Sequence, residues 1–397
     1  MNQTTPLAVD QYSRFMIDTF DQREIISVPT AFQAFFTNGF TNYSPDANIV
    51  DIDIIKGNEK LAALIHRGGE GRSVKGQKNT NEAKWTNVLR KYPLGEEEGD
   101  ISADQLNFRI PGEHPYAAKM KLERMRVLAA KHHLEHIRRY GRLFEFLCSE
   151  ALLKGTMPAI LGTTVSDLIY DFYRLATHLI TVSTKWDAAS PDIFGDIDGA
   201  CDLVRADGHI TPDMMILGGS AMDAFIKDTT VSAVSDNRRY ELIEVSLGNP
   251  VPEHFAKFVA GGLNARGRVR TPKGYELWMF TYNDLYTNAS GVATKYMPES
   301  KALICNSKAR CDRYFGPSEV LPPTAQKAAW YQEMFGFNMT APPMPPIQGS
   351  SDIIRPEMFY SDAYQATNDK NVTIRTQSAP IFATTQTDAF VTLLGLV

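Results

Sequence analysis

The residues from Tyr116 to Lys154 constrain the fold of this chain more than any other segment, because they form a long stretch without proline. Alanine, lysine, leucine, glutamate, arginine and methionine dominate the stretch, and these residues favour an α-helix. Pro115 stands at a plausible first helical position. At about 1.5 Å per residue the predicted helix is on the order of 55–60 Å long, more than the diameter of a compact domain. The helix therefore predicts a flat, elongated molecule.

The periodicity of this helix predicts one apolar and one charged face. The apolar face is expected to hold Leu122, Met125, Ala129, Ile137, Tyr140, Phe144, Leu147 and Ala151. The charged face is expected to hold Arg124, Lys131, Glu135, Arg138, Arg142 and Glu145. Leu128 and Phe146 fall outside the apolar stripe, so a second surface is expected to cover part of the helix.

A two-stranded excursion is predicted before the helix. In residues 49–54, Val50, Ile52 and Ile54 alternate with Ile49, Asp51 and Asp53. This alternation is typical of a strand with one solvated face. Residues 84–92 offer a returning strand, and an acidic run follows. An isolated pair of strands has little core, so residues 49–110 need another surface to rest on.

The middle of this excursion, residues 64–79, reads LIHRGGEGRSVKGQKN and is basic and rich in glycine. It lacks the GxxxxGK[ST] and GxGxxG patterns, and no apolar helical period follows, so the sequence argues against a phosphate-binding loop. Two interpretations remain, namely a long solvated loop or an arm that reaches a neighbouring subunit.

The rest of the chain predicts a mixed α+β protein. Residues 168–184 fit either a strand or a helix, and residues 193–207 fit an amphipathic helix. A further helix is expected to begin with Thr211 as its N-cap and to end or break at the paired Gly218–Gly219. Residues 268–286 have the pattern of a strand, a turn and a second strand.

Composition narrows the class of protein. At 397 residues the chain is expected to form two or more subdomains. Its net charge of −5 argues against a general nucleic-acid binder. No apolar run approaches the roughly 20 residues that a membrane span needs, and the N-terminus lacks the features of a secretory signal. The four cysteines are widely spaced and are expected to be small buried hydrophobes: Cys148, Cys201, Cys305 and Cys311.

The sequence contains few of the motifs that are typical of catalytic or metal sites. His132 and His136 have the i, i+4 spacing that metal ligands can take, but the sequence reads HHLEH and not HExxH. Histidines packed beside the apolar stripe are the favoured interpretation, and Glu135 points to the charged side. No GxSxG elbow is present. The sequence therefore predicts no enzyme, no cofactor and no metal, with a metal-dependent hydrolase using the histidine cluster as the alternative.

Three segments, in this order, carry a resemblance to a known family. The first is RGGEG, from Arg67 to Gly71. The second is residues 296–316, through Pro298, Asn306, Ala309 and Arg310. The third is residues 373–396, through Gln377, Ser378, Ala379, Pro380, Asp388 and Phe390. These segments resemble the turn of the extended loop, an inner segment and the closing strands of the major capsid proteins of tailed bacteriophages of the phage lambda type, called capsid protein E.

The resemblance implies an α+β fold of the HK97-like capsid type. It implies an N-terminal arm and the start of the P-domain over residues 1–48, and an extended β-hairpin, the E-loop, over 49–110. The P-domain with its long spine helix would span 111–184, the A-domain 185–345, and the return to the P-domain strands 346–397. Within the E-loop, intersubunit contacts are expected from Arg67, Gly68, Gly69, Arg72 and Lys75.

The implied function is that of a major capsid protein. Copies would assemble as hexamers and pentamers into an icosahedral head shell around packaged double-stranded DNA, which the shell faces non-specifically. Separate scaffolding, portal and decoration proteins are the expected partners, and a crosslink through Lys75, Lys78 or Asn79 is not favoured. The expected location is the virion, and the host cytoplasm during assembly. An encapsulin-like nanocompartment shell is the alternative of the same fold.

Overall fold

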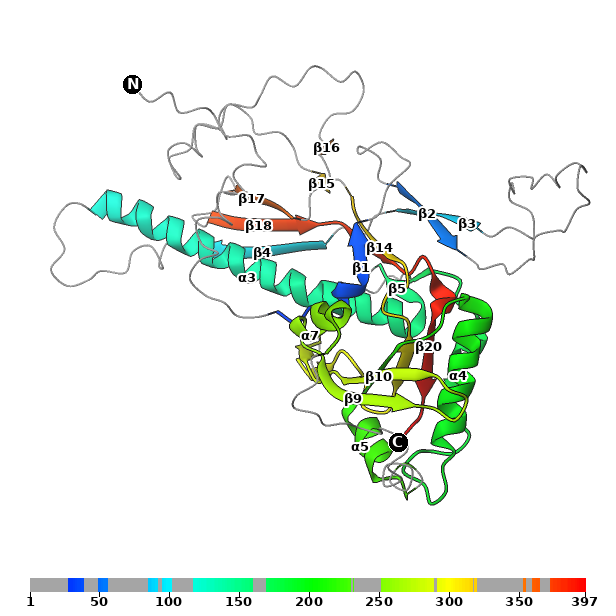
Figure 1. Ribbon diagram of the computed structural model, residues 1–397. Helices are drawn as coiled ribbons and strands as arrows, with labels where there is room; N and C mark the ends of the chain where they lie inside the picture. Colours follow the sequence, from blue (N-terminus) through cyan, green and yellow to red (C-terminus); the bar gives the residue numbers. More distant parts are fainter. Residues whose placement is uncertain are drawn as a thin grey trace, which may run out of the picture.

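The computed structural model describes residues 28–38, 49–55, 85–91, 95–101, 117–159, 169–229, 231, 251–288, 291–316, 318–319, 353–354, 359–364 and 372–397. Its dominant element is helix α3, Ala117–Lys154, which confirms the long helix predicted from the sequence. Figure 1 shows the N-terminal half of α3 projecting from a compact body that surrounds its C-terminal end. The elongated outline expected from the helix length is therefore present.

Helix α3 is followed directly by Gly155, whose φ of 73° lies in the left-handed region that favours glycine. The Gly155 N–H donates to the carbonyl of Ala151 (3.0 Å). Arg174 also donates through Nη2 to the carbonyls of Ala151 (3.2 Å) and Leu152 (2.7 Å). A Cβ at residue 155 would lie 2.7 Å from the Cβ of Arg174, so this close approach also requires glycine.

The apolar stripe of α3 packs into the first of two core clusters. Ala129, Tyr140, Phe144, Leu147 and Ala151 are buried as predicted. The charged face was predicted wrongly at one position, because Glu145 is 0% exposed. Phe146, which lies off the stripe, contacts Tyr286 at 5.2 Å between ring centroids, so a second surface does cover this part of the helix.

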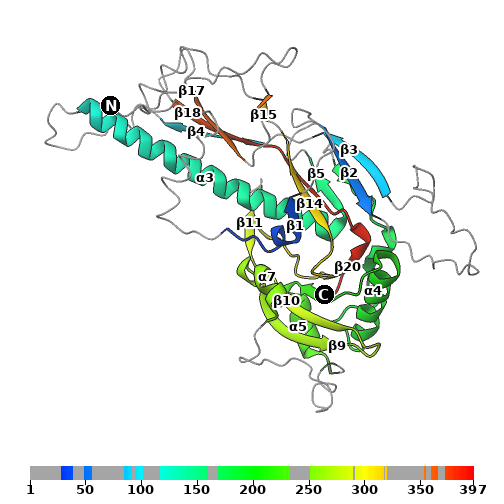
Figure 2. The same ribbon diagram turned by 45° about the horizontal axis from the view of Figure 1, so that its top comes forward.

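The two strands predicted on either side of the basic segment are confirmed. Strand β2, Ile49–Ile55, pairs antiparallel with β3, Trp85–Lys91. The alternation has the predicted consequence, because Ile52 and Ile54 are fully buried. Both belong to the same core as Met157, and Figure 2 shows the pair beside β5, Thr156–Pro158.

Two three-stranded sheets line α3. The first has the order β17, Tyr360–Tyr364, then β18, Val372–Ser378, then β4, Gly95–Ile101. Strand β4 is formed by the acidic run, which has few strand-forming residues, and its full-length antiparallel register with β18 explains why it is extended. The second sheet has the order β1, Phe36–Asn38, then β14, Cys311–Phe315, then β19, Pro380–Ala383.

A six-stranded sheet forms the centre of the compact body, in the order β7, β20, β13, β8, β10, β9. Its strands are β7 Leu179–Thr181, β20 Phe390–Leu394, β13 Ala302–Cys305, β8 Met214–Leu217, β10 Glu276–Thr281 and β9 Asn264–Arg270. Alternate residues enter different cores: Met214 and Ile216 join the core that contains α3, whereas Met215 and Leu217 join the core beneath α4, Ile193–Gly208, and α5, Gly219–Lys227. The sheet is therefore buried on both faces.

The predicted helix after Thr211 is wrong, because residues 214–217 form strand β8. Four consecutive buried apolar residues suit a strand that is covered on both faces as well as they suit a helix. Gly218–Gly219 begins α5 and does not end a helix. A Cβ on Gly218 would lie 2.2 Å from the carbonyl oxygen of Pro298, so glycine allows the backbones to approach closely here.

The remaining described elements are short. They are η1 Gln33–Phe35, β6 Ile169–Asp171, η2 Ala176–His178, η3 Glu253–Phe255, α7 Ala256–Ala260, β11 Leu285–Thr287, β12 Ala293–Lys295, β15 Ser318–Glu319, β16 Ile353–Ile354 and η4 Thr387–Ala389. Helix α4 and the β9–β10 hairpin confirm two predictions. All four cysteines are buried and free, as predicted. Within the described part of the chain, no helix is both long and apolar enough to cross a membrane.

Candidate functional site

The residues singled out by the sequence fall into three places. Arg67, Gly68, Gly69, Arg72 and Lys75 lie outside the described residues, as do Lys78 and Asn79. The structure describes only the strands on either side of them, β2 and β3. The contacts expected from this basic segment therefore stay a prediction.

Pro298, Asn306 and Arg310 lie around strand β13, where they fix its ends. The Pro298 carbonyl accepts from the Lys301 N–H (3.2 Å) in the turn that leads into the strand. At the other end Asn306 donates through Nδ2 to the carbonyl of Thr211, and its Oδ1 accepts from the Lys308 N–H (2.8 Å). Asn306 thus ties the turn after β13 to the start of β8.

Arg310 connects that turn to the C-terminal strands. Its carbonyl accepts from the Gln386 N–H (3.0 Å) and the Thr385 hydroxyl (2.9 Å). Its Nε donates to Asp312 Oδ2 (3.0 Å), and Asp312 is buried while Arg310 is half exposed. Gln386 also donates to the carbonyl of Gly208 at the end of α4 (3.0 Å). One hydrogen-bond network therefore joins β13, α4 and the β19–β20 connection.

Gln377, Ser378 and Pro380 lie on β18 and β19 against α3, and Gln377 and Ser378 are 3% and 0% exposed. Asp388 is 3% exposed and accepts the Leu175 N–H on Oδ1 (3.3 Å). These residues are buried, so they hold the fold together and are not a surface that a partner could reach in this subunit.

A buried polar site around Glu145 on α3 was not predicted from the sequence. Glu145 Oε1 accepts from the Phe32 N–H (2.7 Å) and from the Tyr282 hydroxyl (2.8 Å), and Oε2 accepts from the Gln33 N–H (3.1 Å). Gln33 Nε2 donates in turn to the Gly141 carbonyl (3.1 Å). We call these contacts the Glu145 junction, because they join α3, the segment 28–38 and the residue that follows β10.

Burial dominates the electrostatics of the Glu145 junction. It raises the pKa of Glu145 to about 7, although the donated hydrogen bonds from Phe32, Tyr282 and Gln33 each lower it. Aromatic rings close the site: Phe32 and Tyr282 meet edge to face at 5.0 Å, and Tyr282 stacks on Tyr296 at 5.9 Å. The sequence carried one hint of this site, namely the apolar Phe146 next to Glu145 on the supposedly charged face.

The segment held by the junction continues into a sheet. Phe35 contacts Phe258 at 4.4 Å, and Phe36–Asn38 pairs in parallel with β14. The Thr30 N–H donates to the Gly261 carbonyl (2.9 Å). Residues 28–38 are therefore clamped across the body between α3 and α7 (Figure 2).

Comparison with known proteins shows which family this chain is similar to. The family model described as phage major capsid protein E matches residues 23–394. The chain belongs to this family.

Of three matching solved structures, the first agrees with this chain in fold. A protein described as a prophage capsid protein from E. coli CFT073 matches with a TM-score of 0.57 at 15% identity, over 98% of this chain and 99% of that one. The capsid of Myoviridae phage XM1 matches with a TM-score of 0.42 at 10% identity, over 94% of each chain. The SrpI encapsulin of Synechococcus elongatus PCC 7942 gives 0.40 at 9%, over 94% and 90%. No curated protein matches the sequence.

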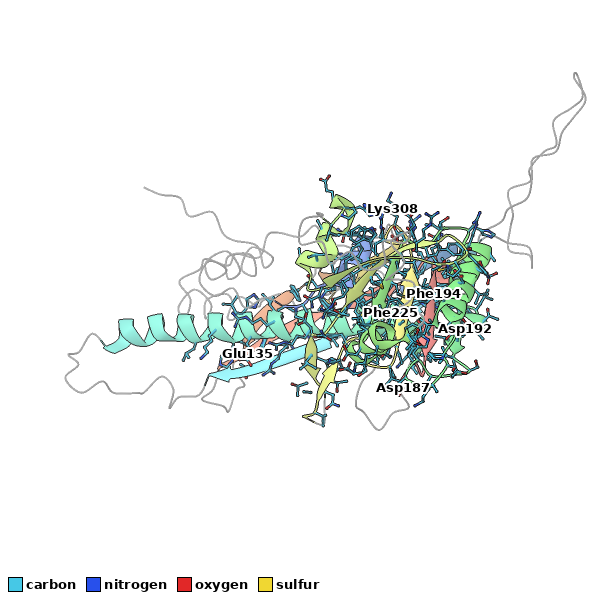
Figure 3. The ribbon with its side chains drawn as sticks, turned by 60° about the horizontal axis from the view of Figure 1, so that its bottom comes forward. Glu135, Asp187, Asp192, Phe194, Phe225 and Lys308 are labelled. Carbon is cyan, nitrogen blue, oxygen red and sulfur yellow. The ribbon has the colours of Figure 1, made fainter. Side chains whose placement is uncertain are left out.

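A phage major capsid protein is a structural protein of the virion and not an enzyme. The histidine cluster fits this role. His133 and His136 are 1% and 2% exposed, and His136 Nδ1 lies 3.1 Å from the hydroxyl of Thr376 on β18. Glu135 is exposed on the projecting half of α3 and binds Arg139 (Figure 3). The described residues contain no group of three or more side chains arranged to hold a metal ion.

Proposed function

We propose that copies of this capsid protein assemble as hexamers and pentamers into the icosahedral head shell of a tailed phage, around packaged double-stranded DNA. The observation that carries the proposal is the family match over residues 23–394. In this proposal the subunit has the HK97-type division given above. Its parts are the N-terminal arm, the E-loop over 49–110, the P-domain with α3 as spine helix, the A-domain over 185–345 and the C-terminal return.

The E-loop is the proposed intersubunit arm. Strands β2 and β3 anchor it through the buried Ile52 and Ile54, so the basic segment between them is attached to the body at both ends. Arg67, Arg72 and Lys75 would dock on an acidic surface of a neighbouring copy. The run Glu96–Asp100 is a suitable partner, because β4 holds its backbone in register with β18 beside α3. Such surface charge pairs are weak singly and would set register more than strength.

Scaffolding, portal and decoration proteins are the proposed partners in assembly, which would take place in the host cytoplasm. The net charge of −5 suits a wall that encloses DNA without binding it tightly. A shell closes through many repeated contacts between identical subunits, and long arms increase the area that each contact buries without a thicker wall.

The first experiment is negative-stain electron microscopy of the chain produced alone and together with the other head proteins of its phage. Closed shells, tubes or capsomer rings are expected, and DNA inside particles from infected cells would separate a phage head from a nanocompartment filled with enzyme. A protein that stays monomeric under both conditions would refute the proposal. Arg67→Glu combined with Arg72→Glu is expected to impair assembly, and unchanged particles would count against the docking of the E-loop.

A further inference from the structure

Two oppositely charged surfaces lie on different sides of the six-stranded sheet. The first is its outer strand, β9, which is at the end of the strand order and pairs with no other described strand beyond β10. Its sequence, NARGRVR, places arginine at 266, 268 and 270. An unpaired edge strand with charged side chains resists uncontrolled strand pairing but remains open to a specific partner.

The arginines do not share one direction. Val269 is fully buried in the core beneath α4 and α5, so Arg268 and Arg270 project from the other face of the sheet. A register shift between Met279 and Phe280 turns the strand at Arg266, whose Nε donates to the Thr281 hydroxyl (3.0 Å). Arg266 and Arg270 are both exposed. The basic charge therefore runs along the edge of the sheet and around to the face away from α4 and α5.

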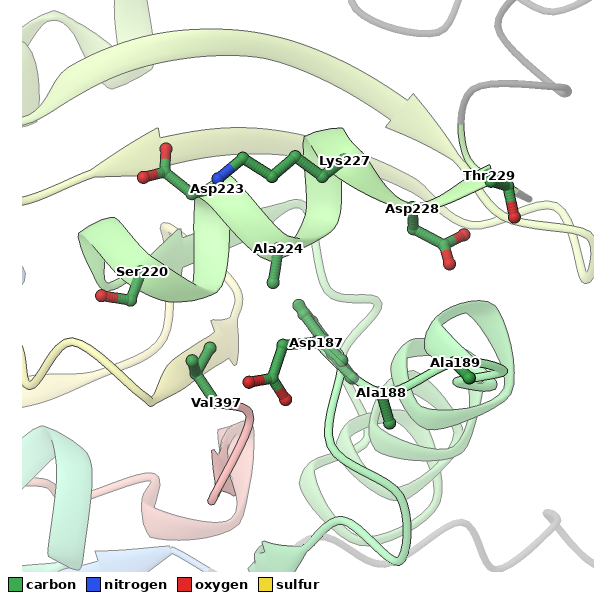
Figure 4. A pocket seen from close by; sticks show the side chains of 11 residues that line it. Asp187, Ala188, Ala189, Ser220, Asp223, Ala224, Lys227, Asp228, Thr229 and Val397 are labelled. Carbon is green, nitrogen blue, oxygen red and sulfur yellow. The ribbon is translucent and has the colours of Figure 1, made fainter.

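The second surface is a pocket of about 390 Å³ between α5 and the segment 186–189 that precedes α4 (Figure 4). Three aspartates and one lysine line it: Asp187, Asp223, Asp228 and Lys227. Asp228 accepts the Val231 N–H (2.9 Å). Asp187 and Asp223 are exposed, and neither has a partner among the residues that the structure describes.

The shape of the pocket suits a guanidinium. Its walls include the small side chains of Ala188, Ala189 and Ala224, which leave room beside the carboxylates. A planar guanidinium binds carboxylates through two parallel hydrogen bonds, which a lysine ammonium cannot reproduce. The lysine in the turn of the β9–β10 hairpin is already used within the subunit, because Lys273 binds Asp202 on α4.

We infer that the β9 edge of one copy, through Arg266 and Arg270, docks on the aspartate pocket of a second copy. The inference rests on the proposed self-assembly and names one contact within it. Because the two surfaces differ, the contact is head to tail, and a head-to-tail contact gives a ring when its rotation closes. It therefore belongs between neighbours around one capsomer. The chain as a whole is acidic, but its β9 edge is locally basic. The aspartate pocket of a second copy supplies the opposite charge, so no other partner is needed to balance it.

A charge-swap experiment tests the contact. The basic variant carries Arg266→Glu and Arg270→Glu, the acidic variant carries Asp187→Lys and Asp223→Lys, and a third chain carries all four changes. Each double variant is expected to lower the assembled fraction at least about tenfold, because like charges would face one another. The four-substitution chain restores opposite charges across every copy of the contact and is expected to recover assembly. Assembly is followed by mass photometry and negative-stain microscopy of rings and shells.

A matched control carries Lys131→Glu and Lys308→Glu, which change the net charge as the basic variant does at exposed sites elsewhere. Its assembly should stay near wild type, and an equal loss would mean that net charge alone is responsible and would overturn the inference. Normal assembly of both double variants, or no recovery in the four-substitution chain with unchanged thermal unfolding, would also overturn it. Normal particles that package less DNA in the basic variant would assign these arginines to DNA. Wild-type chain that forms no particles, either alone or with the other head proteins of its phage, would refute self-assembly itself.

Discussion

The Glu145 junction makes a prediction about stability that a single substitution can isolate. The pKa of Glu145 is raised from 4.5 to about 7, so the folded protein keeps this proton over a pH range in which the unfolded chain has lost it. Its contribution to the unfolding free energy is therefore largest below pH 4.5 and falls as the pH rises to about 7. At about 1.36 kcal/mol per pKa unit, the change amounts to about 3 kcal/mol.

Glu145→Gln removes the titration and keeps the shape. The NH2 group of the glutamine then faces the backbone N–H of either Phe32 or Gln33. That backbone N–H loses its acceptor, and a buried unsatisfied donor costs about 1–3 kcal/mol. Near pH 8 this loss is offset because the variant buries no charge, so the two proteins should differ by less than about 2 kcal/mol. Near pH 4.5 the wild type should gain about 3 kcal/mol on the variant relative to pH 8.

Urea denaturation of the unassembled subunit, followed by tryptophan fluorescence over this pH range, measures the difference directly. Groups that titrate elsewhere act on both proteins and cancel. Tyr282→Phe is the control, because it removes one donor to the carboxyl but keeps the titratable group, so the pH dependence should persist. A difference between wild type and Glu145→Gln that stays constant within about 1 kcal/mol from pH 4.5 to 8 would refute the account of the junction.

Three further predictions concern other positions. Burial and the neighbouring His136 lower the pKa of His133 from 6.5 to about 4, so stability is lost as the pH falls from 6.5 to about 4; His133→Gln should abolish this loss in thermal unfolding measured across that range. Gly155→Ala should destabilise by at least about 2 kcal/mol in denaturant unfolding, because its positive φ is strained with a Cβ and that Cβ would meet Arg174. Gly218→Ala should prevent soluble expression, because the Cβ would meet backbone oxygen at 2.2 Å, whereas Gly199→Ala in open space on α4 should raise stability by about 0.5–1 kcal/mol.

Elements with one buried face and one solvated face were predictable from the sequence. Helix α3 has strong helix formers and an apolar stripe, and α4 has a comparable stripe, so both were located within a few residues. Strand β2 has one solvated and one buried face, and its alternation showed this. The β9–β10 hairpin was marked by its turn, where Gly274 adopts a φ of 91°.

Elements with two buried faces were not predictable in the same way. Strand β8 is apolar at every position, because β13 and β10 flank it and a core lies on each side, so its sequence has no period to detect. Glu145 was placed on the charged face because a helical wheel assumes that one face is buried. The contact of residues 28–38 buries a second face, and no local pattern in α3 records a segment more than a hundred residues away in the chain.

The described residues that carry the family resemblance are not the residues of the proposed contact between β9 and the aspartate pocket. Asn306, Arg310 and Asp388 each bond to strands or turns far along the chain. The hydrogen bonds of Asn306 and Arg310 tie together the ends of β8, β13 and β19, and Gln386 adds the end of α4. A substitution there would disturb the subunit before any contact between subunits formed. The proposed contact between subunits uses side chains that the subunit itself leaves unused, such as Arg270 on the β9 edge and Asp223 beside the pocket. Charge reversal at those two positions can therefore alter assembly while the subunit keeps its fold, and reversal in the buried network cannot.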